Sequence, residues 1–224
     1  MGAQALNRRS PDQKSGKVIG GLEDYDNGET PRVLALLASM LEKSILKNEK
    51  LLKGSNKKEV VTVFHGSRVP ALSIRQYIER IFKYANCSPS CFVVAYIYLD
   101  RFLQQTKSCL TSLNVHRLLI TSFVLAAKYV EDECYNNAYY AKVGGITTSE
   151  MNKLEMKLLV NLEFRLHVDV QTFDDFCFLM EEASVKSENQ SEKPFRFCGL
   201  RKGFTGKDGS SFSPTIQGYS CRAI

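Results

Sequence analysis

Several features that define common protein classes are missing from this sequence. No uninterrupted apolar stretch reaches the roughly 20 residues that a membrane-spanning helix needs. The N-terminus carries no apolar signal core. The mild net charge of +6 is not concentrated in a long basic arm. We therefore expect an intracellular chain, in the nucleus, the cytoplasm or both, that contacts neither a membrane nor nucleic acid.

Metal, disulfide and catalytic signatures are missing as well. The seven cysteines include no C-x-x-C pair and their number is odd, so we expect reduced thiols. His65, His116 and His167 are scattered, without a cysteine or carboxylate at ligand or triad spacing. No glycine-rich phosphate loop precedes a helix. These absences argue against an enzyme and predict no metal or other cofactor.

Apolar residues, which make up 44% of the chain, recur mostly at helical spacing, and no stretch alternates as a strand does. Thr30-Pro31 predicts the start of an N-terminal helix, and residues 30–59 hold this helix and a lysine-rich linker. Thr147-x-x-Glu150 predicts a capping box for a later helix. The expected fold class is all-α. Six further helices are predicted, at residues 73–85, 88–106, 114–132, 137–143, 148–164 and 170–182.

The two ends of the chain differ in composition from the rest. Residues 1–29 are polar, rich in Gly, Asn and Asp, and show no periodicity. Residues 185–224 place five glycines among serines and lysines, with no repeat. Such segments cannot bury enough apolar surface to fold, so we expect both to be disordered. One folded domain is then expected at residues 60–184, with the N-terminal helix before it.

Two of the expected helices are apolar on nearly every side, yet both carry charges. They cover residues 88–106 and 114–132, and a helix of this kind lies at the centre of a bundle. A charge buried there needs a partner. For Asp100 we expect Arg75, on the preceding helix, to form an internal ion pair. The alternative is that Asp100 and Arg101 reach solvent near the helix end.

Lys128 and Glu155 are the charges with the strongest claim to a function. Glu155 has no cation within reach on its own helix. Lys128 has Glu131 and Asp132 at the third and fourth following positions, so a solvated lysine near a helix C-terminus is the alternative. The residues three and four positions away from Glu155 are Met151, Asn152, Leu158 and Leu159.

Several spaced motifs resemble those of a known family. Three segments resemble parts of the cyclin box. They are Tyr98-Leu99-Asp100-Arg101-Phe102-Leu103, Leu125-Ala126-Ala127-Lys128-Tyr129 and Leu154-Glu155-x-x-Leu158-Leu159. Three further segments resemble the fungal phosphate-regulon cyclins more specifically. They are Phe64-His65-Gly66, Pro70-x-x-Ser73-Ile74 and the run from Asn137 to Ile146. The sequence looks most similar to the plant P-type, or U-type, cyclins, over roughly residues 30–183.

The resemblance implies a single five-helix cyclin box with an additional N-terminal helix. It implies a regulatory subunit that binds and activates a cyclin-dependent serine/threonine kinase. In the family, Lys128 and Glu155 would grip the kinase's C-helix, and the internal ion pair would fall on Arg75 and Asp100. A role in cell-cycle or phosphate-related control follows from the resemblance alone. Apolar or aromatic contacts to the kinase would fall on Tyr129, Leu159 and Phe164.

The sequence departs from some cyclins in two respects, and one alternative stays open. Only one box is present. Some cyclins recruit substrates through an apolar patch on the first helix of the box, and here we expect the residues at these positions to pack in the core instead. The alternative is a cyclin-box scaffold of the transcription machinery that binds DNA or protein. B-type general initiation factors use the box twice and add a zinc ribbon, and neither feature is present. The patch positions are Ile74, Tyr77, Ile78 and Ile81.

Overall fold

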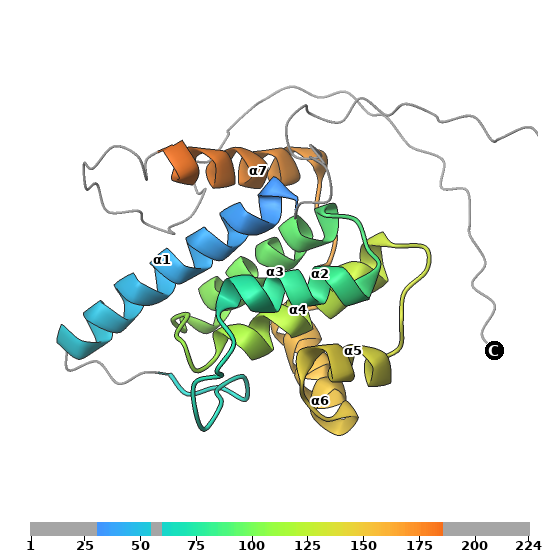
Figure 1. Cartoon of the computed structure of the whole chain (residues 1–224), viewed down its shortest axis with the longest axis horizontal. Helices are drawn as coiled ribbons and strands as arrows, with labels where there is room; N and C mark the ends of the chain where they lie inside the picture. The colour runs from blue at the N-terminus through green and yellow to red at the C-terminus, as the bar shows by residue number, and fades with distance from the viewer. Residues whose placement is uncertain (1–30, 55–59, 186–224) are drawn as a thin grey trace, which may run out of the picture. The chain divides into compact units, whose positions relative to one another are not determined.

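The computed structural model describes residues 31–54 and 60–185, and in these residues the chain forms seven α-helices and no strand (Figure 1). The expected fold class is confirmed. The expected arm at residues 1–29 lies outside the described residues, as does the expected tail apart from the residue that ends the last helix. The helices are α1 (Arg32–Gly54), α2 (Ile74–Ala85), α3 (Ser90–Thr106), α4 (Val115–Val130), α5 (Asn137–Gly144), α6 (Thr148–Asn161) and α7 (Val170–Val185).

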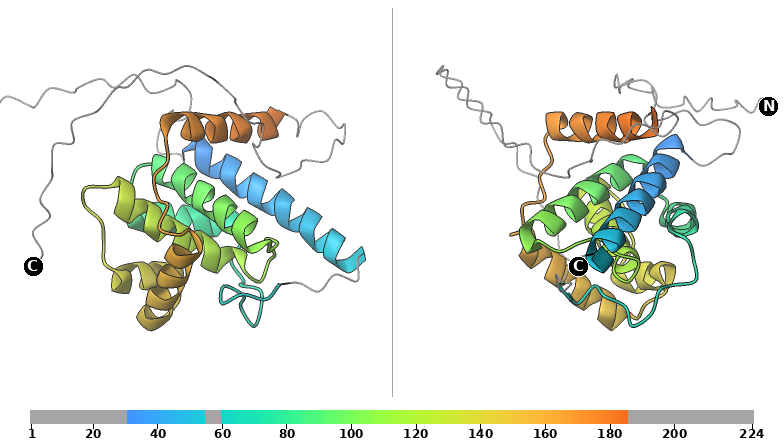
Figure 2. Two further views of the ribbon diagram at one scale, coloured as in Figure 1. Left: turned by 180° about the vertical axis from the view of Figure 1, so that it is seen from behind. Right: turned by 90° about the vertical axis from the view of Figure 1, so that its left-hand side faces the viewer.

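The two apolar helices α3 and α4 lie at the centre, as their composition predicts. Every residue from Cys91 to Asp100 in α3, and from Leu118 to Ala127 in α4, is buried. The other helices pack around them (Figures 1 and 2): α1 and α7 contact α3, whereas α5 and α6 contact α4. This arrangement leaves the C-terminal end of α4 beside α6.

Side chains cap the helices that carry the functional candidates. Ser73 and Gln76 form a full capping box at the start of α2. Thr147 accepts a hydrogen bond from the backbone of Glu150 at the start of α6. The Glu150 carboxylate pairs with Arg117 on α4 at 2.7 Å and thereby ties the start of α6 to the central helix. Only half of the predicted capping box is therefore formed, because this carboxylate has a cationic partner.

The inward face of α2 belongs to the core. Ile74, Tyr77, Ile78 and Ile81 are each at most 9% exposed, which confirms that core packing accounts for them. A polar side of α2, which includes Arg80, lies beside α5. Tyr77 connects the two helices, because its hydroxyl donates to the carbonyl of Gly144 at 3.0 Å.

Helix α6 ends at Asn161, three residues before the predicted end. Glu163 and Phe164 adopt left-handed backbone conformations, with φ of 52° and 56°. Such conformations cannot continue a right-handed helix and are uncommon for residues other than glycine. The turn is held by the Phe164 amide, which donates to the Leu159 carbonyl at 3.0 Å. The chain therefore reverses sharply beside the end of α6.

Candidate functional site

The structure places Lys128 and Glu155 together on the outside of the bundle. The Lys128 Nζ atom lies 2.6 Å from Glu155 Oε1, and joins the last turn of α4 to the middle of α6. The side chains are 33% and 15% exposed, so the pair is neither sealed in the core nor fully solvated. Glu155, which has no cation on its own helix, thus obtains one from the neighbouring helix.

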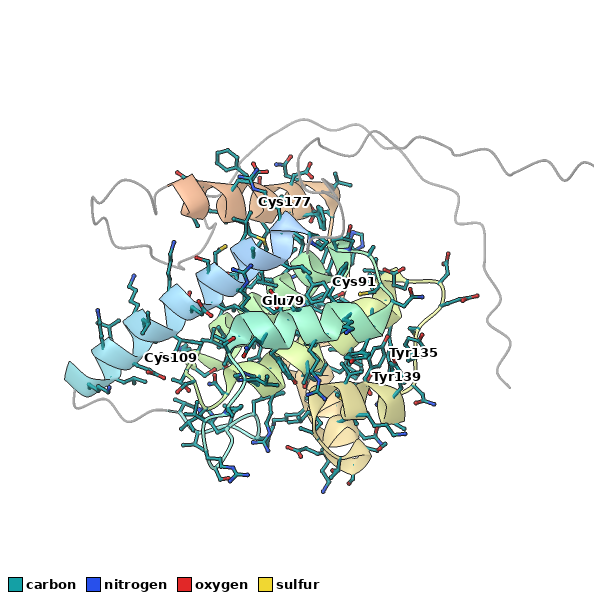
Figure 3. All side chains as sticks on the ribbon, in the orientation of Figure 1. Glu79, Cys91, Cys109, Tyr135, Tyr139 and Cys177 are labelled. Carbon is teal, nitrogen blue, oxygen red and sulfur yellow. The ribbon has the colours of Figure 1, made fainter. Side chains whose placement is uncertain are left out.

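Glu131 does not compete for Lys128, although it lies one turn further along the chain. Its carboxylate accepts hydrogen bonds from the Ser88 amide at 2.8 Å and from the Cys91 thiol at 3.1 Å. The Ser88 amide bond lowers the pKa of Glu131. Cys91 is labelled near the start of α3 in Figure 3 and is one of five cysteines that are free thiols in the described residues. Glu131 therefore bonds to the start of α3. Lys128 pairs instead with Glu155 on α6.

Asn137 completes the charged cluster and was not identified from the sequence. Its Nδ2 atom donates to Glu155 Oε2 at 2.5 Å and to Asn152 Oδ1 at 2.7 Å. Its Oδ1 atom is buried and has no hydrogen-bond partner in the described part of the chain. A buried acceptor without a partner is costly. The arrangement therefore leaves one buried acceptor without a partner next to the ion pair.

The connection between α4 and α5 fixes the position of Asn137. Asn136 caps α5 by accepting from the Tyr139 amide at 3.0 Å. The rings of Tyr135 and Tyr139 stack with centroids 4.0 Å apart, and both are labelled in Figure 3. Tyr140 is buried beneath them. Because Asn137 is the first residue of α5, these contacts place its side chain toward α6.

Exposed apolar side chains flank the ion pair on both helices. Of the predicted contact residues, Tyr129 is 49% exposed, Phe164 is 62% exposed and Leu159 is half-buried. Two further apolar side chains on α6, Met156 and Val160, are 57% and 53% exposed. The α4–α6 surface is the name used below for this set. It comprises Lys128, Tyr129, Val130, Glu155, Met156, Leu159, Val160 and Phe164.

The reversal after α6 presents Phe164 to solvent. Arg101 on α3 donates to the carbonyls of Arg165 and His167 at 3.0 and 3.1 Å. Tyr98 donates to the Leu166 carbonyl at 2.7 Å. These bonds from the central helix hold the segment that follows Phe164. Unusual backbone conformations of this kind persist where the surroundings enforce them, often at functional sites.

The predicted internal ion pair between Arg75 and Asp100 is wrong. Arg75 is 65% exposed and bonds Glu79, four residues along on α2, at 3.0 Å. Asp100 is 5% exposed and accepts a hydrogen bond from Gln104 at 2.6 Å. Ile74 faces the core, so the next position on α2 points outward and Arg75 does not reach α3. Burial raises the pKa of Asp100 to about 6.

The described residues offer little to other classes of site. In residues 31–54 and 60–185, no group of three or more His, Cys, Asp and Glu side chains is placed to hold a metal ion. No helix in these ranges is long and apolar enough to cross a bilayer. The α4–α6 surface itself consists of one ion pair with apolar and aromatic neighbours.

Comparison with known proteins agrees with this architecture. A family model described as Cyclin matches residues 28–166. Cyclin-P3-1 of rice (Oryza sativa subsp. japonica) is 56% identical over 160 residues, which cover 71% of this chain and 68% of the relative. The chain belongs to the cyclin family. Cyclin-U3-1 of Arabidopsis thaliana is 54% identical over 154 residues, covering 68% of this chain and 69% of the relative.

The stretch that matches the family includes the candidate site of this cyclin. Cyclin-U4-1 of Arabidopsis thaliana is 51% identical over 156 residues, covering 69% of this chain and 77% of the relative. The matched stretch of the family model begins before α1 and ends before α7. It includes the whole α4–α6 surface. Cyclins are regulatory proteins rather than enzymes, which agrees with a surface built from contacts.

Proposed function

We propose that this cyclin binds a cyclin-dependent protein kinase through the α4–α6 surface and thereby activates it. Members of the family generally partner with such kinases. The observation that carries the proposal is the partly exposed Lys128–Glu155 pair, which is surrounded by exposed apolar side chains. Exposed apolar surface around a few charged groups is typical of a protein interface.

The charged cluster has unused capacity for hydrogen bonds to a partner. An ammonium group has three donors, and Glu155 is the only hydrogen-bond or ion-pair partner of the Lys128 ammonium in the described ranges. A carboxylate accepts about four hydrogen bonds, and Glu155 receives two, from Lys128 and Asn137. The cluster can therefore accept and donate to a docked helix without breaking its own bonds.

The proposed mechanism is a shift in the kinase's conformational equilibrium. A kinase is productive when a glutamate on its C-helix pairs with the strand lysine that holds the nucleotide phosphates. A partner that docks only on the inward position of this helix increases the population of that state. The cyclin contributes contacts and the kinase contributes the chemistry. The process controlled would be cell division or a phosphate-related response.

Alanine substitution of Glu155 tests the proposal. Docking would remove the pair from water, and truncating one partner of a desolvated charge pair costs about 2–5 kcal/mol. The expected loss of affinity for the kinase is therefore about 30-fold to a few thousandfold. Binding is measured by surface plasmon resonance against a panel of plant cyclin-dependent kinases, and activation by phosphate transfer to a peptide.

Two controls separate binding from folding. Glu133→Ala removes an exposed carboxylate from the loop between α4 and α5, and Lys157→Ala removes an exposed cation from α6. Both should bind the kinase as the native cyclin does. If Glu155→Ala is folded by circular dichroism and still binds and activates with native constants, the proposed kinase site is incorrect.

A further inference from the structure

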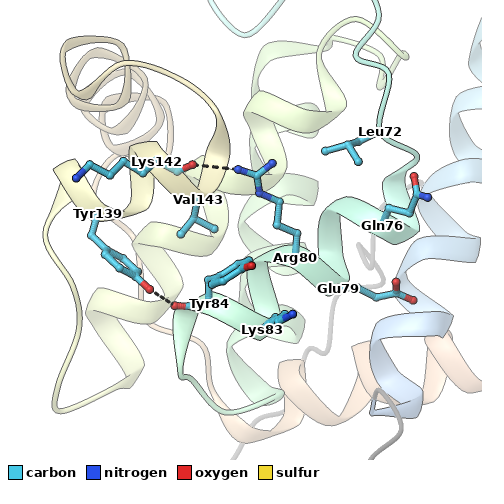
Figure 4. Close-up of a pocket in the computed structure, with 9 residues that line it drawn as sticks. All are labelled: Leu72, Gln76, Glu79, Arg80, Lys83, Tyr84, Tyr139, Lys142 and Val143. Carbon is cyan, nitrogen blue, oxygen red and sulfur yellow. Dashed lines mark hydrogen bonds between the residues drawn. The ribbon is translucent and has the colours of Figure 1, made fainter.

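A groove of about 630 Å³ lies between α2 and α5, outside the α4–α6 surface (Figure 4). It is open to solvent along its length rather than enclosed. Its walls come from the outward face of α2 and the outer side of α5, with a contribution from the segment before α2. The groove is lined by Leu72, Gln76, Glu79, Arg80, Lys83, Tyr84, Tyr139, Lys142 and Val143.

Three hydrogen bonds between the two helices hold the groove in shape. Arg80 Nη2 donates to the Lys142 carbonyl at 3.2 Å, and the Tyr139 hydroxyl donates to the Tyr84 carbonyl at 2.7 Å (Figure 4). The third is the Tyr77–Gly144 bond. A Cβ atom at Gly144 would lie 2.9 Å from the Ile120 side chain, so glycine permits the close approach of α5 to the core. The groove is therefore preformed.

The charge in the groove is predominantly positive. Arg80, Lys83 and Lys142 line it, and no carboxylate in the described residues pairs with any of the three. The one acidic residue in the lining, Glu79, is engaged by Arg75. Arg80 uses Nη2 for the Lys142 carbonyl, and its Nε and Nη1 atoms have no partner in the described ranges. A guanidinium with free donors suits an oxyanion. In Figure 4 the Lys142 side chain extends away from Arg80, so its ammonium must turn toward the groove to join the guanidinium.

Aromatic and aliphatic side chains lie beside these cations. Tyr84 is 48% exposed, and the Lys83 ammonium lies 5.6 Å from the centre of its ring. Leu72 is 38% exposed and stands at the edge of the groove. A free phosphate ion would leave these apolar surfaces unused. A peptide that carries a phosphate can place neighbouring side chains on them, as in other recognition of phosphorylated motifs by basic clusters.

We propose that the groove between α2 and α5 binds a peptide phosphorylated on serine or threonine. The phosphate would be bound by the free donors of Arg80, and the side chains of Lys83 and Lys142 would turn toward it. A neighbouring apolar side chain of the peptide would lie against Tyr84. The open form of the groove favours these short phosphorylated side chains, which keep the phosphate near the peptide backbone. The dianionic phosphate also offers more acceptors to three cations than a carboxylate does. The proposal requires no contact with a kinase, because the lining residues lie outside the α4–α6 surface.

The test uses the full chain and two immobilised peptide libraries. One library has a fixed central phosphothreonine with degenerate flanking positions, and the other has unphosphorylated threonine at the same position. The native protein should be retained at least about tenfold more by the phosphorylated library, the smallest gain expected from new charge-assisted hydrogen bonds. A selected peptide is then labelled for fluorescence polarisation. Arg80→Gln should weaken its binding by about tenfold or more.

A charge-matched pair of double variants guards against misfolding. Lys83→Ser combined with Lys142→Ser removes two cations whose ammonium groups make no bond in the described residues, and should abolish phosphate-dependent retention. Lys153→Ser combined with Lys157→Ser removes two exposed cations from α6 and should leave retention unchanged. Equal retention by the two libraries would overturn the proposal. So would full competition by an equimolar single-stranded oligonucleotide, or equal losses in the two double variants.

Discussion

Asp100 and Glu155 are two carboxylates on largely apolar helices that reach opposite solutions to the same problem. Asp100 lies on the central helix α3, is 5% exposed and has the neutral amide of Gln104 as its hydrogen-bond donor. Glu155 lies on the outer helix α6, keeps contact with water and pairs with Lys128. Burial without an ion pair makes the first a cost to the fold, although the nearby Arg101 charge reduces this cost. The second is partly exposed and has a cation as its partner. Location in the bundle, rather than residue type, separates the buried carboxylate from the one that we propose binds a partner.

After substitution of the Lys128–Glu155 pair itself, we expect substitution of Phe164 to lower kinase affinity the most. This aromatic side chain is 62% exposed and would become a buried anchor in the kinase complex. Interface anchors of this kind typically cost 2 kcal/mol or more when truncated, which is about 30-fold in affinity. Phe164→Gly suits the left-handed conformation, so stability should be retained while binding falls. Surface plasmon resonance and thermal melting measure the two quantities. A loss of stability without a loss of affinity would show that Phe164 stabilises the fold and does not contact the kinase.

The Asp100 side of the comparison is tested by Asp100→Asn. Burial raises the pKa of Asp100 to about 6 from an ordinary value near 3.8. The folded state therefore binds more protons than the unfolded state between these values, and stability falls as the pH rises through them. Asparagine removes the cost, so the variant should be about 1–3 kcal/mol more stable at pH 7.5 and no more stable at pH 3.5.

Urea denaturation at the two pH values measures this difference. Asp132→Asn, an exposed substitution beyond the end of α4, is the matched control and should change stability little at either pH. Kinase affinity should be unaffected by Asp100→Asn. A less stable Asp100→Asn variant at pH 7.5 would show that the Asp100 charge supports the fold, which contradicts the contrast with Glu155.

A smaller effect is expected at Glu131, whose carboxylate is partly buried yet stabilising. Glu131→Ala leaves the Ser88 amide without its acceptor and should cost about 1 kcal/mol in unfolding free energy. The Ser88 bond lowers the pKa of Glu131, so its contribution is present above the unfolded pKa and lost as the pH falls through the folded one. Urea denaturation should therefore show the deficit at pH 7 and a smaller one near pH 3. A constant deficit would mean that packing, rather than charge, is responsible.

The sequence was sufficient to predict much of this architecture, because apolar periodicity reports burial directly. The all-round apolar pattern of residues 91–103 and 115–130 placed α3 and α4 at the centre, where they are found. The lack of a cation near Glu155 on its own helix indicated a partner elsewhere, and Lys128 is that partner. Local backbone effects were harder to predict. Helix α6 ends at Asn161 because two following residues adopt left-handed backbone conformations, and neither is a glycine, the residue that usually indicates such a conformation in a sequence.

The errors share one cause. A sequence predicts which face of each helix is buried, but it does not predict which side chains on different helices come within reach of one another. Arg75 was assigned to Asp100 because Asp100 needed a partner and Arg75 lies on the preceding helix, yet each has a local partner four residues away. Asn137 escaped notice because an asparagine at a helix start is ordinary, and only the packing of α5 on α6 brings it to Glu155. Met156 and Val160 have the apolar character of core residues and are exposed only because α6 lies at the edge.

Reversal of the Lys128–Glu155 pair tests the central claim most directly. The double variant Lys128→Glu with Glu155→Lys can re-form the ion pair within the cyclin, so its melting temperature should stay close to the native value while each single reversal lowers it. The account predicts that kinase binding, measured by surface plasmon resonance, is lost in the double variant, because the charges presented to the kinase are inverted. Native affinity in the double variant would contradict the account and show that the pair serves only to join α4 to α6.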